Sequence, residues 1–208
     1  MCPHALIPYK PKNPKTRLSA ILSQEEREKF AFAMLEDVVS AAKDAMCTPV
    51  IVGTELFDSE MVQVTVTDAD LNQSLNEILP TTEQNILIIM ADLPLADEAS
   101  IRRVTSTTKD MAIVPGRGGG TNAIYIRDPK KFHVDYYGAS FSKHMKIAQD
   151  AGLSVEVIDS FRLHTDIDED DDFVELLIHG TGKSRAYLEE LGFHLETETG
   201  RVRVARKR

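Results

Sequence analysis

Asp92 stands at the end of a predicted strand, where a carboxylate can do chemistry. The apolar run 86–90 precedes it and predicts a strand buried on both faces, as in a parallel sheet, and Leu93-Pro94 stops that strand. In open α/β sheets, ligands bind beyond the carboxyl ends of the strands, which is the position that Asp92 takes. On the local pattern alone, capping of the next helix is an equally good interpretation of this aspartate.

A second group of carboxylates, the acidic run 166–172, lies much further along the chain. In an extended segment, residues two apart point to the same side, so Asp166 and Asp168 can present both carboxylates to one site. Clustered carboxylates suit a hard cation such as Mg²⁺, which usually binds together with substrate phosphates. The alternative is a charged helix N-terminus favoured by the helix dipole, and it explains residues 170–172 better than Asp166 and Asp168.

A cationic loop follows the first predicted strand. Residues 10–19 hold two prolines and four cations, which are Lys10, Lys12, Lys15 and Arg17. The loop has no acidic residue, so we expect its cations to be free for an anion. The alternative is an ordinary solvated basic loop.

Two further segments could bind an anion through backbone N–H groups. Glycine-rich residues 116–122 let the backbone approach a ligand closely, and their candidate contacts are Gly119, Gly120, Thr121 and Asn122. The alternative is a flexible hairpin turn. Residues 138–142 precede a predicted helix and offer Gly138 and Ser140 to a phosphate or carboxylate, unless Ser140 is only a cap. On that helix, Lys143 and His144 are expected to face solvent.

Three matches to known motifs fail. Residues 180–184 suggest a phosphate-binding P-loop but lack its first glycine and its preceding strand. Residues 116–120 precede a strand instead of a helix, so they are no dinucleotide-binding fingerprint. Residues 166–170 begin like a calcium loop, but Asp171 replaces the required glycine.

Strands and helices alternate around these candidates. The predicted strands are 4–9, 49–53, 62–66, 86–90, 111–115, 123–127 and 154–158. The first predicted helix begins at a capping box, Ser23–Glu26, and the later helices are predicted at 71–79, 97–107, 141–151, 173–178 and 184–191. The tail 193–206, broken at Thr199-Gly200, predicts a hairpin with basic ends. This alternation predicts an α/β fold with a mostly parallel sheet.

Composition excludes several classes of protein. Hydrophobic residues make up 42% of the 208-residue chain and charged residues 27%, which is typical of one soluble globular domain. The net charge of −9 argues against a general nucleic-acid binder, which needs clustered cations. No apolar run reaches membrane-spanning length, the N-terminus lacks the features of a signal peptide, and two cysteines suggest neither a disulfide framework nor a zinc site. We therefore expect a cytoplasmic protein.

Several of these segments occur together in one known family. In chain order they are Lys12-x-x-Lys15-Thr16-Arg17-Leu18, the helix segment Ala33-Met34-Leu35-x-Asp37-Val38, Asp92-Leu93-Pro94-Leu95, the Gly118–Ala123 segment and Asp166-Ile167-Asp168. Together they resemble the 2-phospho-L-lactate guanylyltransferases of coenzyme F420 biosynthesis, found in archaea and, in related form, in actinobacteria. The match covers roughly residues 4 to 175.

The resemblance implies a fold, an activity and a set of roles. The fold would be a three-layer α/β/α nucleotidyltransferase of the nucleotide-diphospho-sugar transferase type with a mixed, mostly parallel sheet. Residues 1–180 would form it, with 181–208 as an appended helix and hairpin of the same domain. The activity would be GMP transfer from GTP to 2-phospho-L-lactate. Asp92, Asp166 and Asp168 would hold Mg²⁺, Thr121, Gly138 and Ser140 would contact the phospho-acid, and Lys12, Lys15 and Arg17 would face the triphosphate.

Two alternatives stay open at this point. One is a related nucleotidyltransferase with phosphoenolpyruvate, molybdopterin or a sugar phosphate as acceptor, and the other is a non-catalytic nucleotide-binding protein. The expected partners are GTP and the phospho-acid, with no nucleic acid and no membrane. The C-terminal hairpin suggests a homodimer.

Overall fold

The computed structural model describes residues 2–53, 62–67, 69–197 and 200–207. Seven strands form one sheet in the order β3-β2-β1-β4-β6-β5-β7, and only β6 runs antiparallel to its neighbours. The strands are β1 (His4–Tyr9), β2 (Thr48–Gly53), β3 (Gln63–Val66), β4 (Ile86–Ile89), β5 (Met111–Pro115), β6 (Thr121–Ile126) and β7 (Val155–Val157). The expected mixed, mostly parallel α/β sheet is confirmed.

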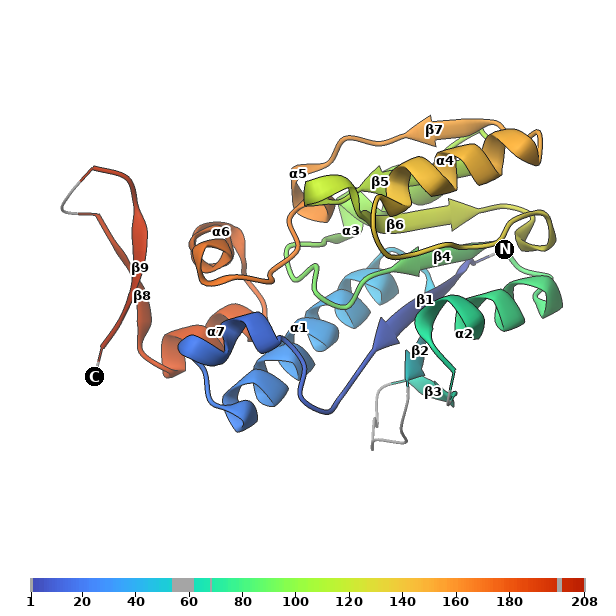
Figure 1. The fold of residues 1–208 in the computed structure, drawn as a ribbon. Coiled ribbons are helices and arrows are strands. Elements are labelled where there is room, and N and C mark those ends of the chain that lie inside the picture. The colour runs from blue at the N-terminus through green and yellow to red at the C-terminus, as the bar shows by residue number, and fades with distance from the viewer. Residues whose placement is uncertain (1, 54–61, 68, 198–199, 208) are drawn as a thin grey trace.

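Helices cover both faces of this sheet (Figure 1). They are α1 (Gln24–Asp44), α2 (Leu71–Ile78), α3 (Glu98–Thr105), α4 (Ser140–Asp150), α5 (Phe161–His164), α6 (Phe173–His179) and α7 (Lys183–Glu190). One core lies between the sheet and α1, α3, α5, α6 and α7, and a second lies between the sheet and α2 and α4. All four residues of β4 are buried, because this central strand contributes side chains to both cores.

Side-chain caps fix where several helices begin. The Ser23 hydroxyl accepts a hydrogen bond from the Glu26 N–H, and the Glu26 carboxylate accepts one from the Ser23 N–H, which confirms the predicted capping box of α1. Asp97 caps α3 by accepting from the Ser100 N–H at 2.8 Å. Because Asp97 takes this role, the alternative that Asp92 caps that helix is wrong.

The failed P-loop match has a structural explanation. The N-terminus of α7 is held by Asp37 of α1, whose carboxylate accepts from Lys183 N, Ser184 N and Ser184 Oγ at 2.7, 3.0 and 2.5 Å. A Cβ on Gly182 would lie only 2.2 Å from that carboxylate. The glycine is therefore needed for helix packing, and the N–H groups that a phosphate would use already have an acceptor.

The C-terminal hairpin, β8 (Phe193–Glu196) and β9 (Arg203–Arg206), forms a separate two-stranded sheet. It extends away from the main sheet (Figure 1). Thr199 of its predicted turn lies outside the described residues. The short 3₁₀ segments are η1 (Thr16–Ala20), η2 (Leu79–Thr81), η3 (Arg117–Gly119), η4 (Pro129–Lys131) and η5 (Asp170–Asp172).

Candidate active site

The candidate residues meet at one edge of the sheet. β1, β4, β5 and β7 run parallel, so the chain that leaves each of them emerges at the same edge, and antiparallel β6 begins there. The Ile167 N–H donates a 3.0 Å hydrogen bond to the Asp92 carbonyl. This bond places Asp166 and Asp168 on either side of a residue anchored to Asp92, although 74 or more residues separate them along the chain.

Lys15 lies between two of the three candidate metal ligands. Its Nζ donates to Asp92 Oδ2 at 2.8 Å and to Asp168 Oδ1 at 2.5 Å. Burial alone would lower the pKa of this ammonium, but the charges of Asp92 and Asp168 outweigh burial and raise it. Lys15 therefore stays charged and neutralises a pair of carboxylates that would otherwise repel each other.

The expectation that the cationic loop lacks acidic partners is wrong. Besides the two contacts of Lys15, Arg17 pairs with Asp168 at 3.3 Å. Lys12 lies near Glu28, whose pKa is held low by hydrogen bonds from Gln24 and Asn13, with a smaller contribution from Lys12. The partners come from distant segments, which the loop's own composition cannot reveal.

Arg27 of α1 holds the cationic loop in place. This arginine is buried, and its guanidinium donates to Pro14 O, Leu22 O and Asn13 Oδ1 at 3.2, 3.1 and 2.8 Å. Asn13 and Lys15 both have positive φ angles, 46° and 51°, which non-glycine residues rarely adopt. The contacts of Arg27 thus support a backbone that aims the Lys15 side chain at Asp92 and Asp168.

Asp166 is the least compensated carboxylate of the site. Its buried Oδ1 has no hydrogen-bond partner among the described residues, and the nearest cation is Arg117, with Nε 3.7 Å away. Burial, followed by the nearby charges of Asp92 and Asp168, raises the pKa of this carboxyl. Two negative charges therefore act on Asp166, and no ammonium of the described residues bridges it as Lys15 bridges the other two.

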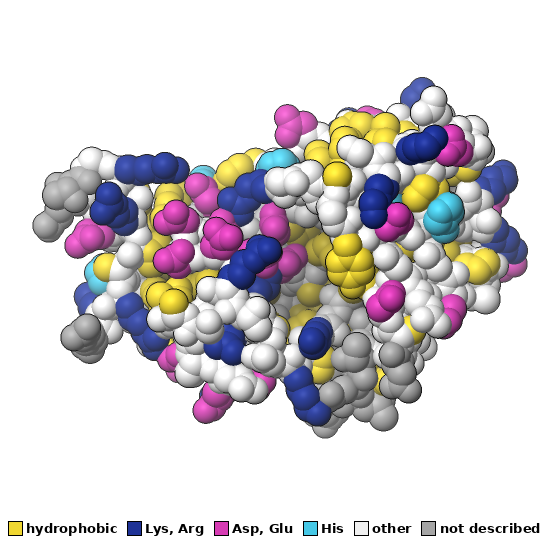
Figure 2. Space-filling view, in the orientation of Figure 1, with side chains coloured by type: hydrophobic (Ala, Val, Ile, Leu, Met, Phe, Trp, Pro, Cys, Tyr) yellow, Lys and Arg dark blue, Asp and Glu magenta, His cyan; other side chains and the backbone are white. Residues whose placement is uncertain are grey.

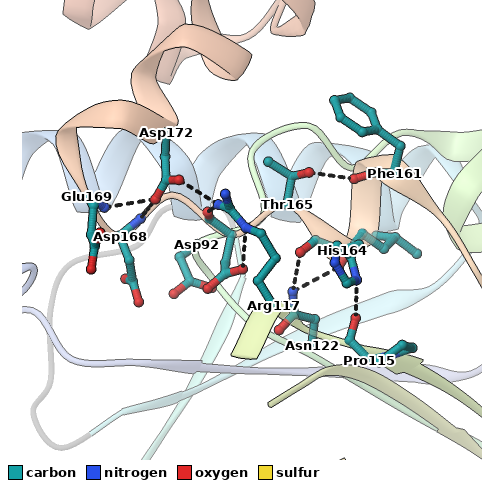
Figure 3. A network of polar contacts seen from close by, with 12 residues as sticks. Asp92, Pro115, Arg117, Asn122, Phe161, His164, Thr165, Asp168, Glu169 and Asp172 are labelled. Atoms are coloured by element: carbon teal, nitrogen blue, oxygen red, sulfur yellow. Dashed lines mark hydrogen bonds and ion pairs between the residues drawn. The ribbon is translucent and has the colours of Figure 1, made fainter. Parts of the chain in front are cut away.

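Asp172 organises the acidic segment from within (Figure 3). Its Oδ2 accepts from the N–H groups of Asp168 and Glu169, both at 2.8 Å, and its Oδ1 accepts from Arg117 at 2.7 Å. Arg117 also donates to the Asp166 carbonyl at 2.5 Å. The arginine of the glycine-rich loop thus fastens the acidic run to β5 and β6.

The glycine-rich loop is a tight structure, closed by a 2.9 Å hydrogen bond from Gly116 N to Gly120 O. Gly118 and Gly119 have φ angles of 72° and 86°, where a side chain would strain the backbone. A Cβ on Gly116 would lie 2.1 Å from Asn122 Oδ1. Asn122 itself donates to the carbonyls of Leu163 and His164, so its amide nitrogen binds α5 (Figure 3).

Thr121, Ser140 and His144 form a buried polar cluster. Ser140 Oγ donates to Thr121 Oγ1 at 3.3 Å, and His144 Nδ1 lies 3.0 Å from the same oxygen. The expectation that His144 faces solvent is wrong, because its side chain is fully buried, whereas Lys143 is exposed as expected. Ser140 does not cap α4, whose N-cap is Ala139, and Gly138 turns the chain ahead of the helix with a φ of 59°.

A cavity of about 450 Å³ lies beside these groups. It is bordered by the cationic loop, the end of β4 and α1, and its lining includes Lys15, Arg17, Met34, Asp92 and Asp168. Figure 2 shows this face of the molecule hollowed near its centre, with acidic and basic side chains beside the hollow. An anion here would meet Lys15 and Arg17 while lying next to the carboxylates.

The donor set fits a hard divalent cation. The three side chains offer carboxylate oxygens, and within the described part of the chain Asp166 Oδ1 is a buried acceptor without a hydrogen-bond donor. Among the residues that the structure describes, no three acidic, His or Cys side chains are arranged as a ready metal site. Lys15 lies between Asp92 and Asp168, so a metal that these two carboxylates shared with Asp166 would compete with the ammonium for their oxygens.

The sequence and the fold both match known proteins. The model of a family described as "Guanylyl transferase CofC like" matches residues 3–207. This chain belongs to the CofC-like guanylyl transferase family. A 2-phospho-L-lactate guanylyltransferase of Methanoregula boonei is 69% identical over 99% of this chain and 96% of its own length. A 2-phospho-L-lactate guanylyltransferase of Methanosphaerula palustris is 54% identical over 99% of this chain and 99% of its own length.

Solved structures show how this CofC-like chain compares in fold. A candidate nucleotide-diphospho-sugar transferase from Desulfovibrio desulfuricans G20 superposes with a TM-score of 0.74 at 16% identity, covering 91% of this chain and 95% of that one. A Mycobacterium tuberculosis protein solved with manganese superposes with a TM-score of 0.53 at 15% identity, covering 85% and 98%. The predicted nucleotidyltransferase fold is thus confirmed. In the described part of this CofC-like chain, no helix is long and apolar enough to span a membrane.

Sequence reasoning did not identify the residues that hold other side chains or loops of this CofC-like site in place. Arg117 is the only cation of the glycine-rich loop, and Asp172 is the last residue of the acidic run. A single cation in one loop and a carboxylate at the end of the acidic run are features of the sequence from which an ion pair between Arg117 and Asp172 could have been predicted. Arg27 and His144 gave no comparable signal, because each lies on a helix among other polar residues and its partners are distant in sequence.

Proposed function

We propose that this CofC-like protein transfers GMP from GTP to 2-phospho-L-lactate, releasing pyrophosphate and giving lactyl-2-diphospho-5′-guanosine for coenzyme F420. The observation that carries this proposal is the meeting of Lys15 with Asp92 and Asp168 beside a cavity at the carboxyl edge of the sheet. The names of the most similar relatives support the substrates.

The reaction is an in-line displacement at phosphorus. A phosphate oxygen of the acceptor forms a bond to the α-phosphorus of GTP, and the bond from that phosphorus to the bridging oxygen of pyrophosphate breaks. The attacking oxygen is already anionic, so the step needs no protein nucleophile and no general base. The main difficulty is to hold two polyanions together in line, which positioning and positive charge overcome.

Lys15 and Arg17 supply positive charge on the leaving-group side. When a triphosphate enters the cavity, its oxygens compete with Asp92 and Asp168 for the Lys15 ammonium. Charge that builds on the departing pyrophosphate is then offset by Lys15 and Arg17. Lys12 extends the same cationic loop toward the triphosphate.

Asp92, Asp166 and Asp168 are the residues that would hold Mg²⁺, which supplies charge that offsets repulsion between the two substrates. The manganese in a neighbour of the same fold supports the use of a divalent cation. Thr121, Ser140 and the backbone around Gly138 would form the acceptor side, and Gly119 and Gly120 would offer backbone N–H groups to a phosphate.

The direct test is a product analysis. The protein, GTP and Mg²⁺ are incubated with 2-phospho-L-lactate, phosphoenolpyruvate or a sugar phosphate, and the product mass and released pyrophosphate are measured. We expect the mass of lactyl-2-diphospho-5′-guanosine with phospholactate. If another acceptor reacted faster, that acceptor would replace phospholactate in this proposal. If GTP bound but was not turned over with any acceptor, the protein would be a non-catalytic nucleotide-binding protein.

Asp92→Asn tests the metal assignment. We expect loss of more than about 100-fold in turnover, because a neutral amide is a poor ligand for a hard cation. The melting temperature should stay close to that of the wild type. Asp150→Asn, which changes an exposed carboxylate at the end of α4, serves as the matched control. Near-normal pyrophosphate release by Asp92→Asn would refute the assignment.

The same chain offers a surface for a homodimer. A groove of about 1280 Å³ is lined by residues of both the C-terminal hairpin and α6. The side formed by η5 and α6 carries Asp170, Asp171 and Glu175, and the hairpin side carries Arg201 and Arg203. Around a two-fold axis, the basic hairpin of each copy would face the acidic side of the other, which is the self-complementarity that such a dimer requires.

A further inference from the structure

His144 lies behind the acceptor side of the site, enclosed by aromatic rings. Its side chain is fully buried, with the Tyr136 ring centroid at 4.9 Å and the Phe132 centroid at 5.9 Å. Both ring nitrogens nevertheless have polar partners: Nδ1 lies 3.0 Å from Thr121 Oγ1, and Nε2 lies 3.0 Å from the backbone nitrogen of Asp135. A buried imidazole that is satisfied at both nitrogens is held in one orientation.

These partners determine which nitrogen of His144 carries the hydrogen. The Asp135 backbone nitrogen can only donate, so Nε2 must be the unprotonated acceptor. In the neutral imidazole the hydrogen is then on Nδ1, which donates it to Thr121 Oγ1. Burial lowers the pKa of His144 to about 4, so the ring stays neutral near pH 7.

The hydrogen bonds around Thr121 leave its own hydrogen for another acceptor. Its oxygen accepts from His144 Nδ1 and from Ser140 Oγ, which uses both lone pairs. Ser140 and His144 therefore fix the direction in which the Thr121 hydroxyl donates. Among the described residues, Thr121 Oγ1 is hydrogen-bonded only to His144 Nδ1 and Ser140 Oγ, and both of these act as donors to it. The Thr121 hydroxyl hydrogen therefore has no acceptor among these residues.

A β-bulge aims Thr121 at α4. Ala123 pairs with Val114 and Thr121 pairs with Pro115, so Asn122 is the extra residue of β6. Because of this extra residue, Thr121 points to the sheet face covered by α4, opposite to the face of Ala123. The register of β4 and β6 also places Thr121 beside the residues that lead to Asp92.

We propose that His144 is a positioning residue that fixes the Thr121 hydroxyl as a hydrogen-bond donor to an anionic oxygen of the acceptor, a phosphorylated hydroxy acid. The inference rests on the proposed function, which places Thr121 on the acceptor side, and it adds the role of His144. His144 does not touch the substrate. It acts through Thr121 and selects an acceptor that presents an anionic oxygen to this hydroxyl.

The test is a double-mutant cycle with the acceptor and GTP varied separately. Thr121→Val removes the hydroxyl at nearly constant shape, and His144→Leu removes its donor. We expect each change to raise the KM for phospholactate about tenfold, the loss of one hydrogen bond to a charged group, with the KM for GTP within about twofold of the wild type. The double variant should be no worse than Thr121→Val, because His144 acts only through that hydroxyl. His144→Asn, whose amide can still donate from near Nδ1, should recover part of the loss.

Additive effects of the two changes, or an equal rise in the KM for GTP, would overturn the inference in favour of a purely structural histidine. Should His144→Leu not fold, ¹⁵N NMR of the wild-type imidazole decides the question. Hydrogen on Nδ1 supports the inference, and hydrogen on Nε2 overturns it. If the wild-type protein does not turn over phospholactate at all, the proposed function fails instead, and the NMR result still reports on His144.

Discussion

Asp166 shows how a binding site can cost stability. Lys15 compensates Asp92 and Asp168. The Asp166 carboxyl, by contrast, has a raised pKa, and its buried Oδ1 has no hydrogen-bond partner among the residues that the structure describes. A carboxyl whose pKa is higher in the folded than in the unfolded protein destabilises the fold once it is ionised, so the cost is present at pH 7 and disappears in acid. Such a charge is retained where a ligand uses it.

Asp166→Asn should therefore stabilise the metal-free protein while it abolishes turnover. The amide removes the buried negative charge and its repulsion by Asp92 and Asp168, and we expect the free energy of unfolding at pH 7 to rise by about 1 kcal/mol. Urea unfolding in the presence of a chelator measures this change. Asp150→Asn, at an exposed position, should change stability by less than about 0.5 kcal/mol. A less stable Asp166→Asn variant would mean that the carboxylate is structural.

His144 should make the stability of the protein depend on pH. Burial, opposed by the charge of Asp135, gives the ring a pKa of about 4, against about 6.5 in an unfolded chain. Between these values the unfolded chain takes up a proton that the folded protein excludes, so stability falls as the pH falls from 6.5 to 4. From pH 7 to pH 5 we expect this residue to account for a loss of about 2 kcal/mol.

The measurement compares urea unfolding of the wild type and His144→Asn at both pH values. Other groups titrate in both proteins, so the difference between the two reports on position 144. The wild-type advantage at pH 7 should shrink by about 2 kcal/mol at pH 5. If the difference in unfolding free energy between the two proteins were the same at both pH values, the His144 ring would take up its proton in the folded protein by pH 5.

At the scale of elements, the cationic loop depends on the helix behind it. Arg27 binds three acceptors of the loop and the following turn, and it supports two residues with positive φ. Arg27→Met keeps the apolar stem but removes these bonds, and we expect a loss of about 2–4 kcal/mol in unfolding free energy. Because Lys15 is then held less firmly, the KM for GTP should rise several-fold.

Lys29→Met on the same helix is the control for Arg27. Its i,i+4 pair with Glu25 is exposed, so both stability and the KM for GTP should stay near wild-type values. If a folded Arg27→Met variant had an unchanged KM for GTP, the conformation of the cationic loop would not contribute to triphosphate binding.

Elements were predictable from sequence to the extent that their signals are local. The capping box of α1 and the buried run of β4 depend on neighbouring residues, and the structure has both. Helix α5 was missed because four residues carry too little periodicity. The partners of Lys15 and the burial of His144 depend on which strands lie side by side, and no local pattern contains that information.

At the scale of the whole molecule, charge is distributed unevenly. The chain has a net charge of −9, yet Arg201, Arg203, Arg206 and Lys207 gather on the hairpin. Figure 2 shows acidic side chains over the neighbouring part of the molecule. Arg206 already binds Glu26 at 2.5 Å, which ties the hairpin to α1 of its own chain. The more distal Arg203 is exposed and is the better contact for a second copy.

Arg203→Glu should therefore convert the proposed dimer into a monomer. The change places a negative charge opposite the partner's acidic α6 side, and a two-fold axis repeats the repulsion at a second, equivalent contact. Light scattering after gel filtration gives the molar mass. Lys146→Glu alters the net charge equally on exposed α4 and should leave the dimer intact. Salt screens both the attraction between opposite charges and the repulsion between like charges, so raising the ionic strength should weaken the wild-type dimer and partly restore that of Arg203→Glu. A wild-type protein that is monomeric at all concentrations, or a variant that dimerises as well as the wild type, would show that the hairpin serves only its own chain.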